Sequence, residues 1–187
     1  MSLVSIRSSA LSLTAATSAP PDLLGLLLAC HQRIRTFIAL AQSIAQQTAA
    51  SDAEVRDASL RCHRYFFEAL PLHVLDEEMS LLPRLRELVP ALAPALSRMH
   101  SEHLGHGPQV RQLCDLLDAL AKAPAQAPVR AQLAVVAAHL QSDFAAHLLA
   151  EETEIFPWIA KVLSSEDQAA VIFELRARRL APEPHNI

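Results

Sequence analysis

The sequence predicts an all-α protein. Among its 187 residues there are only three glycines and one tyrosine, and aromatic residues make up 4%. Hydrophobic residues reach 51% and charged residues 19%. The prominent alanine and leucine are strong helix formers, whereas sheets favour aromatic residues and glycine-containing turns. A chain of this length normally forms one domain, which we expect to be an up-down-up-down four-helix bundle with a short extra C-terminal helix.

The first two helices are predicted for residues 23–48 and 51–82. Along the first, apolar residues recur at the three- and four-residue spacing of a helix face. Ser51 and Glu54 form a capping-box pattern at the start of the second helix. Pro71 should kink the second helix, because proline removes a backbone hydrogen-bond donor.

The next helices are predicted for residues 92–122 and 129–156. Pro108 and two neighbouring glycines should bend or interrupt the first of these. Pro157 should end the other, because the residue before a proline disfavours the helical conformation. A short fifth helix is expected to begin at Ser165, capped with the help of a glutamine three residues later.

The domain is expected to span residues 22–180. Residues 1–21, which are rich in serine, alanine and threonine, should form a flexible leader, and residues 181–187 a loose tail. The chain from Arg178 onward has no apolar stripe to bury, so we expect it to be loose as well.

Composition excludes some partners and favours one compartment. The 16 basic and 20 acidic residues give a net charge of −4 without a basic cluster, so nucleic acid is not expected as a partner. No uninterrupted apolar run approaches the roughly 20 residues of a membrane helix, so no membrane association is expected. The odd count and wide spacing of Cys30, Cys62 and Cys114 favour reduced thiols and a cytoplasmic location.

An internal repeat carries the candidate chemistry. Residues 73–83 read HVLDEEMSLLP and residues 147–157 read HLLAEETEIFP, so histidine, two glutamates and proline coincide. Residues four apart share a helix face, which pairs an imidazole with a carboxylate in each copy. These donors suit a divalent iron, manganese or zinc ion, and two copies suggest two metals. The pairs are His73 with Glu77 and His147 with Glu151.

The two remaining long helices each place a histidine at the same height. At 1.5 Å of helix per residue, His31 lies about as far from its connecting turn as His73 does from the same turn. The same count brings His103 level with His147 across the proline–alanine connector. Four helices therefore converge on one polar site.

This pattern resembles the hemerythrin-like, or HHE cation-binding, domains over about residues 23–160. The resemblance rests on the repeated motif, on a histidine in the first helix and on the pair Glu102-His103. It implies a non-heme centre of two iron ions with oxo and carboxylate bridges, for which zinc or manganese are possible substitutes. The implied ligands are His31, His73, His103 and His147, with Glu77 and Glu151 as bridges.

The sequence departs from the oxygen-carrying hemerythrins. Those proteins use a fifth histidine, four residues from another on the third helix, and an aspartate five residues after the last histidine. Here Met99 and Gly107 flank His103, and Glu151 lies four residues after His147. The pattern is more similar to the di-iron domain of bacterial iron-sulfur cluster repair proteins, although their extra N-terminal domain with a Cys-x-Cys pair is not found in this sequence.

The resemblance implies a protein that binds or senses oxygen, nitric oxide or peroxide. One alternative is a redox enzyme that reduces nitric oxide or peroxide, with Glu102 or a nearby histidine supplying protons. Another is an iron donor for iron-sulfur cluster repair. Whether the chain catalyses a reaction stays open, and no protein partner is indicated.

Five neighbouring residues have open roles. His100 and His106 lie three residues from His103 and could reach the same face. Glu78 and Glu152 are either solvated charges or partners that orient ligand imidazoles. Glu102 is either an acid near an open coordination position or a surface carboxylate. A bundle without metal would have to bury carboxylates and imidazoles uncompensated, which is unfavourable.

Overall fold

The computed structural model describes residues 22–47 and 49–180. These residues are helical almost throughout and include no strand, which confirms the predicted all-α class. The predicted leader, residues 1–21, and the predicted tail, residues 181–187, lie outside the described residues. The elements in chain order are α1 (Leu23–Gln46), α2 (Asp52–Arg64), η1 (Tyr65–Ala69), α3 (Leu70–Leu75), η2 (Asp76–Leu81), α4 (Leu82–Leu88), η3 (Pro90–Leu92), α5 (Ala93–Lys122), α6 (Ala127–Ala150), η4 (Glu151–Ile155), η5 (Phe156–Trp158), α7 (Ile159–Val162) and α8 (Ser165–Leu180).

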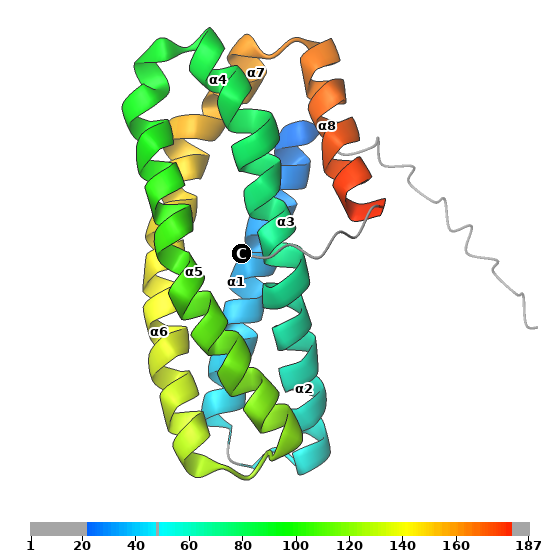
Figure 1. Ribbon diagram of the computed structural model, residues 1–187, viewed down its shortest axis with the longest axis vertical. Helices are drawn as coiled ribbons and strands as arrows, with labels where there is room; N and C mark the ends of the chain where they lie inside the picture. Colours follow the sequence, from blue (N-terminus) through cyan, green and yellow to red (C-terminus); the bar gives the residue numbers. More distant parts are fainter. Residues whose placement is uncertain (1–21, 48, 181–187) are drawn as a thin grey trace, which may run out of the picture.

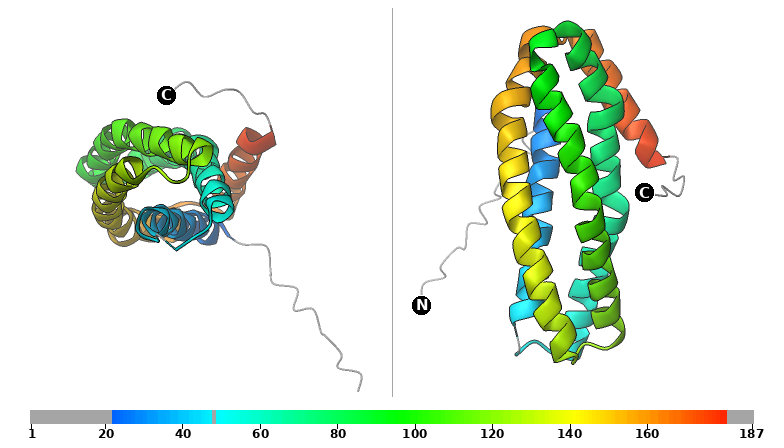
Figure 2. Two further views of the ribbon diagram at one scale, coloured as in Figure 1. Left: turned by 90° about the horizontal axis from the view of Figure 1, so that it is seen from below. Right: turned by 60° about the vertical axis from the view of Figure 1, so that its left-hand side comes forward.

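Long helical segments lie side by side to form the body of the molecule. Figure 1 shows α1, the continuous segment from α2 to α4, α5 and α6 packed along their lengths, and the end-on view in Figure 2 shows them around a common centre. The shorter α8 packs outside, against α1 and η2. This arrangement brings residues from distant parts of the chain to one level.

The starts of α2 and α8 follow local capping chemistry. Ser51 accepts a hydrogen bond from the backbone N–H of Glu54, and the Glu54 carboxylate accepts one in return, as the capping-box pattern predicts. The cap of α8 lies one residue earlier than predicted. Ser164 accepts from the backbone N–H of Asp167, whose carboxylate accepts from the Ser164 backbone and hydroxyl.

The prolines of the repeat do not end their helices, which corrects the predicted boundaries. The segment continues through Pro83 to Leu88, and the path after Pro157 continues through a tight 3-10 turn to Val162. A wider π-helical turn precedes each proline. The extra residue in such a turn makes room for the proline ring, which in an α-helix clashes with a carbonyl of the preceding turn.

Each π-helical turn is closed by the residue before its proline. The backbone N–H of Leu82 donates to the carbonyl of Glu77, and that of Phe156 donates to the carbonyl of Glu151. A third turn, η1, follows the same rule ahead of Pro71, where the sequence predicts a kink. The two site glutamates therefore lie in helix turns of unusual width.

Helix α5 is not interrupted, so of the two predicted outcomes for its middle, a bend or an interruption, the interruption is wrong. Pro108 lies inside a single helix of 30 residues. Both Pro108 and Leu104, whose carbonyl loses its usual donor, are exposed, so water can satisfy that carbonyl. Buried side chains such as Met99 and Leu113 anchor the helix on both sides.

Helix α8 extends further than predicted, through Leu180. Arg178 donates to one Asp76 carboxylate oxygen at 2.9 Å and Arg179 to the other at 2.6 Å. Asp76 itself is 1% exposed. The expectation that the chain is loose from Arg178 onward is therefore wrong for residues 178–180, because two ion pairs fix them.

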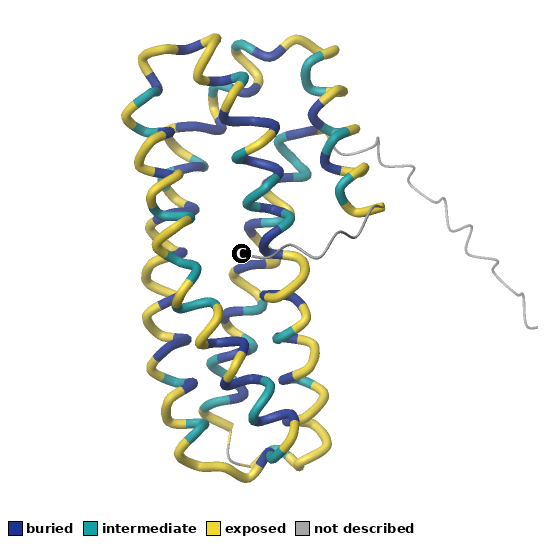
Figure 3. The backbone as a smooth tube through the Cα atoms, viewed as in Figure 1, coloured by how far each residue is buried: buried dark blue, intermediate teal, exposed yellow. Residues whose placement is uncertain are grey.

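Two apolar clusters enclose the polar centre. Buried residues alternate with exposed ones along each helix (Figure 3), as expected when one face of each helix points into the bundle. On α1, Leu27 belongs to one cluster and Ile34 to the other, with His31 between them. On α5, Met99 and Leu113 flank His103 in the same way. The site is therefore a polar layer between two hydrophobic layers.

Two helical stretches, Leu23–Gln46 and Ala127–Val162, are long and apolar enough to cross a bilayer by length and hydropathy alone. The sequence prediction missed this because polar residues divide their apolar runs. The core helices of soluble bundles pass the same test, and both stretches supply buried polar residues to the centre. The finding is therefore weak evidence for a membrane location.

Candidate metal centre

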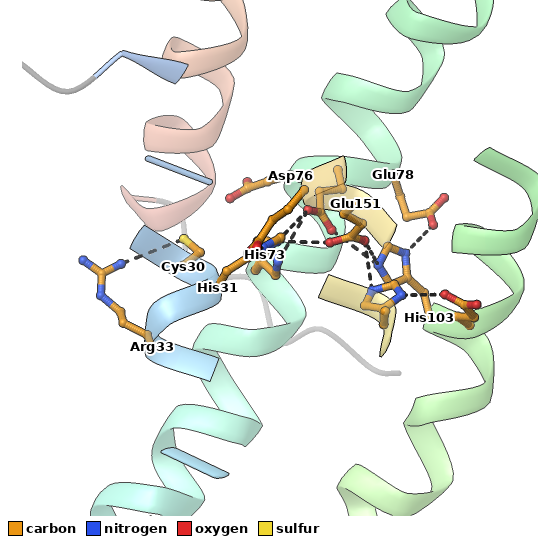
Figure 4. Close-up of polar contacts among 12 residues, drawn as sticks. Cys30, His31, Arg33, His73, Asp76, Glu78, His103 and Glu151 are labelled. Carbon is orange, nitrogen blue, oxygen red and sulfur yellow. Dashed lines mark hydrogen bonds and ion pairs between the residues drawn. The ribbon is translucent and has the colours of Figure 1, made fainter. Parts of the chain in front are cut away.

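The structure brings all six predicted ligands together. His31 comes from α1, His73 from α3 and His103 from α5, while His147 lies in the last turn of α6. The two glutamates, Glu77 in η2 and Glu151 in η4, lie between them. In Figure 4, His31 and His73 lie on one side of Glu151 and His103 on the other. All six side chains are at most 5% exposed.

One group of possible ligand atoms contains His31, His73, Glu77 and Glu151. The Nε2 atom of His31 lies 3.0 Å from Oε2 of Glu151 and 3.7 Å from Oε1 of Glu77. The Nε2 atom of His73 lies 3.5 Å from the same Glu77 oxygen. Two imidazoles and two carboxylates can thus face one cation.

A second group contains His103, His147 and Glu151. Oε1 of Glu151 lies 2.9 Å from Nε2 of His147 and 3.6 Å from Nε2 of His103. Oε2 of Glu77 lies 3.3 Å from Nε2 of His103. Each carboxylate therefore directs one oxygen to each group, which is the arrangement that bridging ligands require.

Buried polar atoms without hydrogen-bond partners indicate that the cluster is suited to hold cations. Several buried atoms of the cluster have no hydrogen-bond partner, although buried polar atoms normally have one. They approach one another closely without hydrogen-bond geometry, as ligand atoms around a common ion do. The atoms are Nε2 of His31 and His103 and both oxygens of Glu77 and Glu151.

Three imidazoles are oriented through their other nitrogen. Nδ1 of His31 lies 2.8 Å from Glu152, and Nδ1 of His103 lies 2.6 Å from Glu78. The second glutamate of each repeat thus reaches a histidine on a neighbouring helix. Such contacts fix the tautomer that directs Nε2 toward a metal.

The third imidazole with a carboxylate partner is that of His147, whose Nδ1 lies 2.8 Å from Glu102. Of the roles left open by the sequence, Glu78, Glu102 and Glu152 therefore contact the candidate ligands directly. His73 differs from the other three, because its buried Nδ1 has no hydrogen-bond partner.

The raised pKa values of two imidazoles show that the buried carboxylates favour positive charge beside them. Burial opposes protonation of His31, but its contacts with Glu151 and Glu77 raise the pKa of this imidazole to about 10. Burial likewise opposes protonation of His103, but the same two carboxylates and Glu78 raise its pKa to about 11. Carboxylates that hold protons on neighbouring imidazoles can bind divalent cations in their place.

The two other histidines of α5 lie outside the ligand groups. His100 is half exposed, with Nδ1 2.9 Å from Glu78. The His106 ring lies 5.0 Å from that of His147 and 4.6 Å from that of Phe144. Burial and the neighbouring His147 and His103 lower the pKa of His106 to about 4.

Sequence reasoning missed the support behind the site. Asp76, next to Glu77, is buried against the arginines of α8, and Arg35 donates to Glu152 at 2.8 Å. An acidic residue three positions after His73 lies near the same helix face, which is the signal that could have found Asp76. No local pattern indicated its partners, which come from the end of the chain.

Comparison with known proteins agrees with this geometry. A comparison with curated proteins gives no match. Among protein families, the Hemerythrin HHE cation binding domain matches residues 22–159. The match covers most of the chain and every residue of the two ligand groups. A metal-binding helical domain is therefore shown, and the chain belongs to the hemerythrin HHE cation-binding domain family.

Proposed function

We propose that the chain is a non-heme di-iron protein, with an up-down-up-down bundle, that binds or senses oxygen, nitric oxide or peroxide. The observation that carries this proposal is the pair of ligand groups, which share Glu151, with Glu77 of the first group directing its other oxygen to His103 of the second. Each group offers two imidazoles and two carboxylate oxygens, fewer donors than the six positions that iron commonly uses. A pair of iron ions held there would supply electron transfer to a small ligand.

The residues around the centre have defined tasks in this proposal. Glu77 and Glu151 hold the pair of cations together, while Glu78, Glu102 and Glu152 keep three imidazoles in the ligand tautomer. The apolar clusters above and below exclude bulk water, with the Phe156 ring 4.9 Å from that of His31. Small uncharged ligands are the class best suited to such a dry site.

A second candidate function, reduction of nitric oxide or peroxide, is favoured by a polar chain from the surface. Half-exposed His100 contacts Glu78, which contacts buried His103. Groups in this order can deliver protons to a reaction at the centre. Turnover with an added reductant, and its loss in a His100→Ala variant that keeps its metal, would distinguish catalysis from binding.

Location and metal identity are part of the proposal. The three cysteines are free in the structure, which supports a reducing compartment such as the cytoplasm. Iron is supported by the family, since the same donors also accept zinc or manganese.

The first experiment measures metal content and then ligand response. Protein purified anaerobically from iron-replete cells should contain about two iron atoms per chain, and a His73→Ala, His147→Ala variant about none. His139→Ala, an exposed histidine outside the site, is the matched control and should keep both. The reduced protein should then change its absorption spectrum with oxygen, nitric oxide or peroxide. Zinc, or iron without any spectral response, would contradict the proposal.

A further inference from the structure

A cavity of about 540 Å³ lies beside the His31 and His73 half of the centre. Its walls come from α1, from the α2, η1 and α3 segment, and from the last turn of α8. Volumes of this size hold metabolites rather than diatomic gases. The cavity therefore needs an explanation that the metal centre alone does not give.

The walls carry a surplus of positive charge. Four arginines contribute to the lining, against a single lining carboxylate, Glu68, and one of the four, Arg179, is already paired with buried Asp76. Two of these arginines have only exposed partners on an adjacent helix turn, at 3.5 Å, and such pairs contribute little. Arg33 contacts no carboxylate within ion-pair distance among the described residues. The arginines are Arg33, Arg61, Arg64 and Arg179.

Apolar surface lies beside these charges. The rings of Phe37 and Tyr65 stack with centroids 4.1 Å apart and planes 6° apart, and both rings line the cavity with Leu72. A phosphate or sulfate ion would leave this surface without a partner. A ligand with an anionic head and a short apolar body would use both parts of the wall.

His73 gives the third observation. It lines the cavity, it is 3% exposed, and its Nδ1 has no hydrogen-bond partner. The other three candidate ligand imidazoles each have a carboxylate 2.6 to 2.8 Å from Nδ1. His73 lacks only this carboxylate.

We propose that the cavity binds a small organic carboxylate that completes the surroundings of His73. Nδ1 of His73 is buried in the structure, so binding includes a shift of this ring toward the cavity, after which one carboxylate oxygen accepts a hydrogen bond from Nδ1. Arg33 and the weakly paired Arg61 and Arg64 neutralise the charge, and the apolar body packs on Phe37 and Tyr65. The step at His73 rests on the proposed metal centre, because Nδ1 carries the proton when Nε2 binds a metal. Occupancy would then orient this imidazole as Glu102 orients His147, which couples an organic acid to the metal centre.

The test uses the full chain loaded with zinc, which is diamagnetic and independent of iron chemistry. Benzoate and octanoate are titrated by calorimetry, with phosphate and benzyl alcohol as probes that have only the charge or only the apolar body. Both carboxylates should bind, and each partial probe should bind at least about tenfold more weakly. In nitrogen-15 spectra, benzoate should shift His73 Nδ1 and leave His147 Nδ1 unchanged.

Two variants remove the site in different ways. Arg33→Gln, Arg64→Gln should weaken benzoate binding at least about tenfold. Ala69→Trp should block the cavity without a change in charge, because Ala69 lines it. The matched control, Arg86→Gln, Arg176→Gln, removes the same charge from exposed positions outside the cavity and should bind as the wild type does.

Metal content, measured in every sample, separates this inference from the proposed function. Full metal content with no benzoate binding would overturn the anion site and leave the metal centre standing. Equal weakening in the control variant, or stronger binding of phosphate than of benzoate, would also overturn it. A chain without metal that still binds benzoate at the arginines would retain the anion site and refute its link to His73.

Discussion

The two copies of the repeated motif share their chemistry but differ in what surrounds them. In both, the first glutamate points to the centre, the second contacts a histidine on a neighbouring helix, and a π-helical turn closes before the proline. Three residues after the histidine, however, the first copy has buried Asp76 and the second has Ala150. The motif thus defines the ligand pair, and other helices make the two halves unequal.

The histidines of the two copies also differ in the direction of their pKa shifts. Burial lowers the pKa of His73 despite the nearby Glu77. For His147, contacts with Glu151 and Glu102 outweigh burial and raise the pKa. Imidazoles with a carboxylate partner are the stronger metal ligands. The His103 and His147 half, with a carboxylate behind both rings, should therefore hold its metal more tightly.

Loss of Glu77 or Glu151 should have the largest effect on metal content, and the effect should be the same for the two copies of the motif. Glu77→Ala and Glu151→Ala each remove one oxygen from both ligand groups, so metal content should fall from about two per chain to near zero. Elemental analysis after dialysis measures this, with exposed Glu87→Ala as the control. Two metals retained in either variant would contradict the bridging role of that residue.

The pH dependence of metal binding should be the next largest effect. In the metal-free chain His31 and His103 have pKa values of about 10 and 11, so loading at pH 7 should release at least about two protons. Joint affinity for both metals should then rise about a hundredfold per pH unit. Calorimetry in two buffers of different ionisation enthalpy counts the protons. Release of fewer than one would contradict these pKa values.

The raised pKa values of His31 and His103 also make the stability of the metal-free protein depend on pH. Because both folded-state pKa values lie above 6.5, the stability that these two imidazoles contribute is complete below about pH 6.5 and is lost as pH rises toward 10 or 11. Between pH 6.5 and 10, the melting temperature should fall without metal and stay nearly level with metal bound, because the metal-bound chain holds no more protons on these imidazoles than the unfolded chain does. Parallel slopes would refute the exchange of protons for metal.

Removing a carboxylate behind one imidazole should have an intermediate effect and sharpen the comparison of the halves. Glu102→Gln should weaken metal binding about 10- to 100-fold, because His147 loses its charged partner. The competition of a chelator for each metal gives the two affinities. Glu87→Gln is the matched control, and equal weakening in both variants would reduce Glu102 to a surface charge.

The smallest effect is expected at the feature that only the first copy has. Asp76→Asn should lower the free energy of unfolding by about 1–3 kcal/mol, since two arginines of α8 lose their buried partner. Urea unfolding of the metal-free chain measures it. Asp57→Asn, at a 70% exposed side chain, should change stability by less than about 0.5 kcal/mol. An unchanged midpoint for Asp76→Asn would show that α8 does not secure η2.

The outcome shows which parts of a site a sequence can specify. Helical class and the convergence of the six candidate ligands follow from periodicity and spacing, because a helix has a fixed rise and turn. The prolines misled the prediction, since a proline inside a wider turn reads the same as one at a helix end. The α8 arginines on Asp76 had no local signal, because such contacts depend on how distant helices pack.

The cross-helix carboxylate contacts also determine when the centre can form during folding. Each His-x-x-x-Glu pair is local and can capture a cation as soon as its own helix turn exists. The residue that orients His31, however, is 121 positions away, and those that orient His147 and His103 are 45 and 25 positions away. With the proposed pair of metals, a nascent chain would have only single-metal sites until α6 docks. Only the complete bundle would then hold the pair, so metal retention would report that the last long helix is in place.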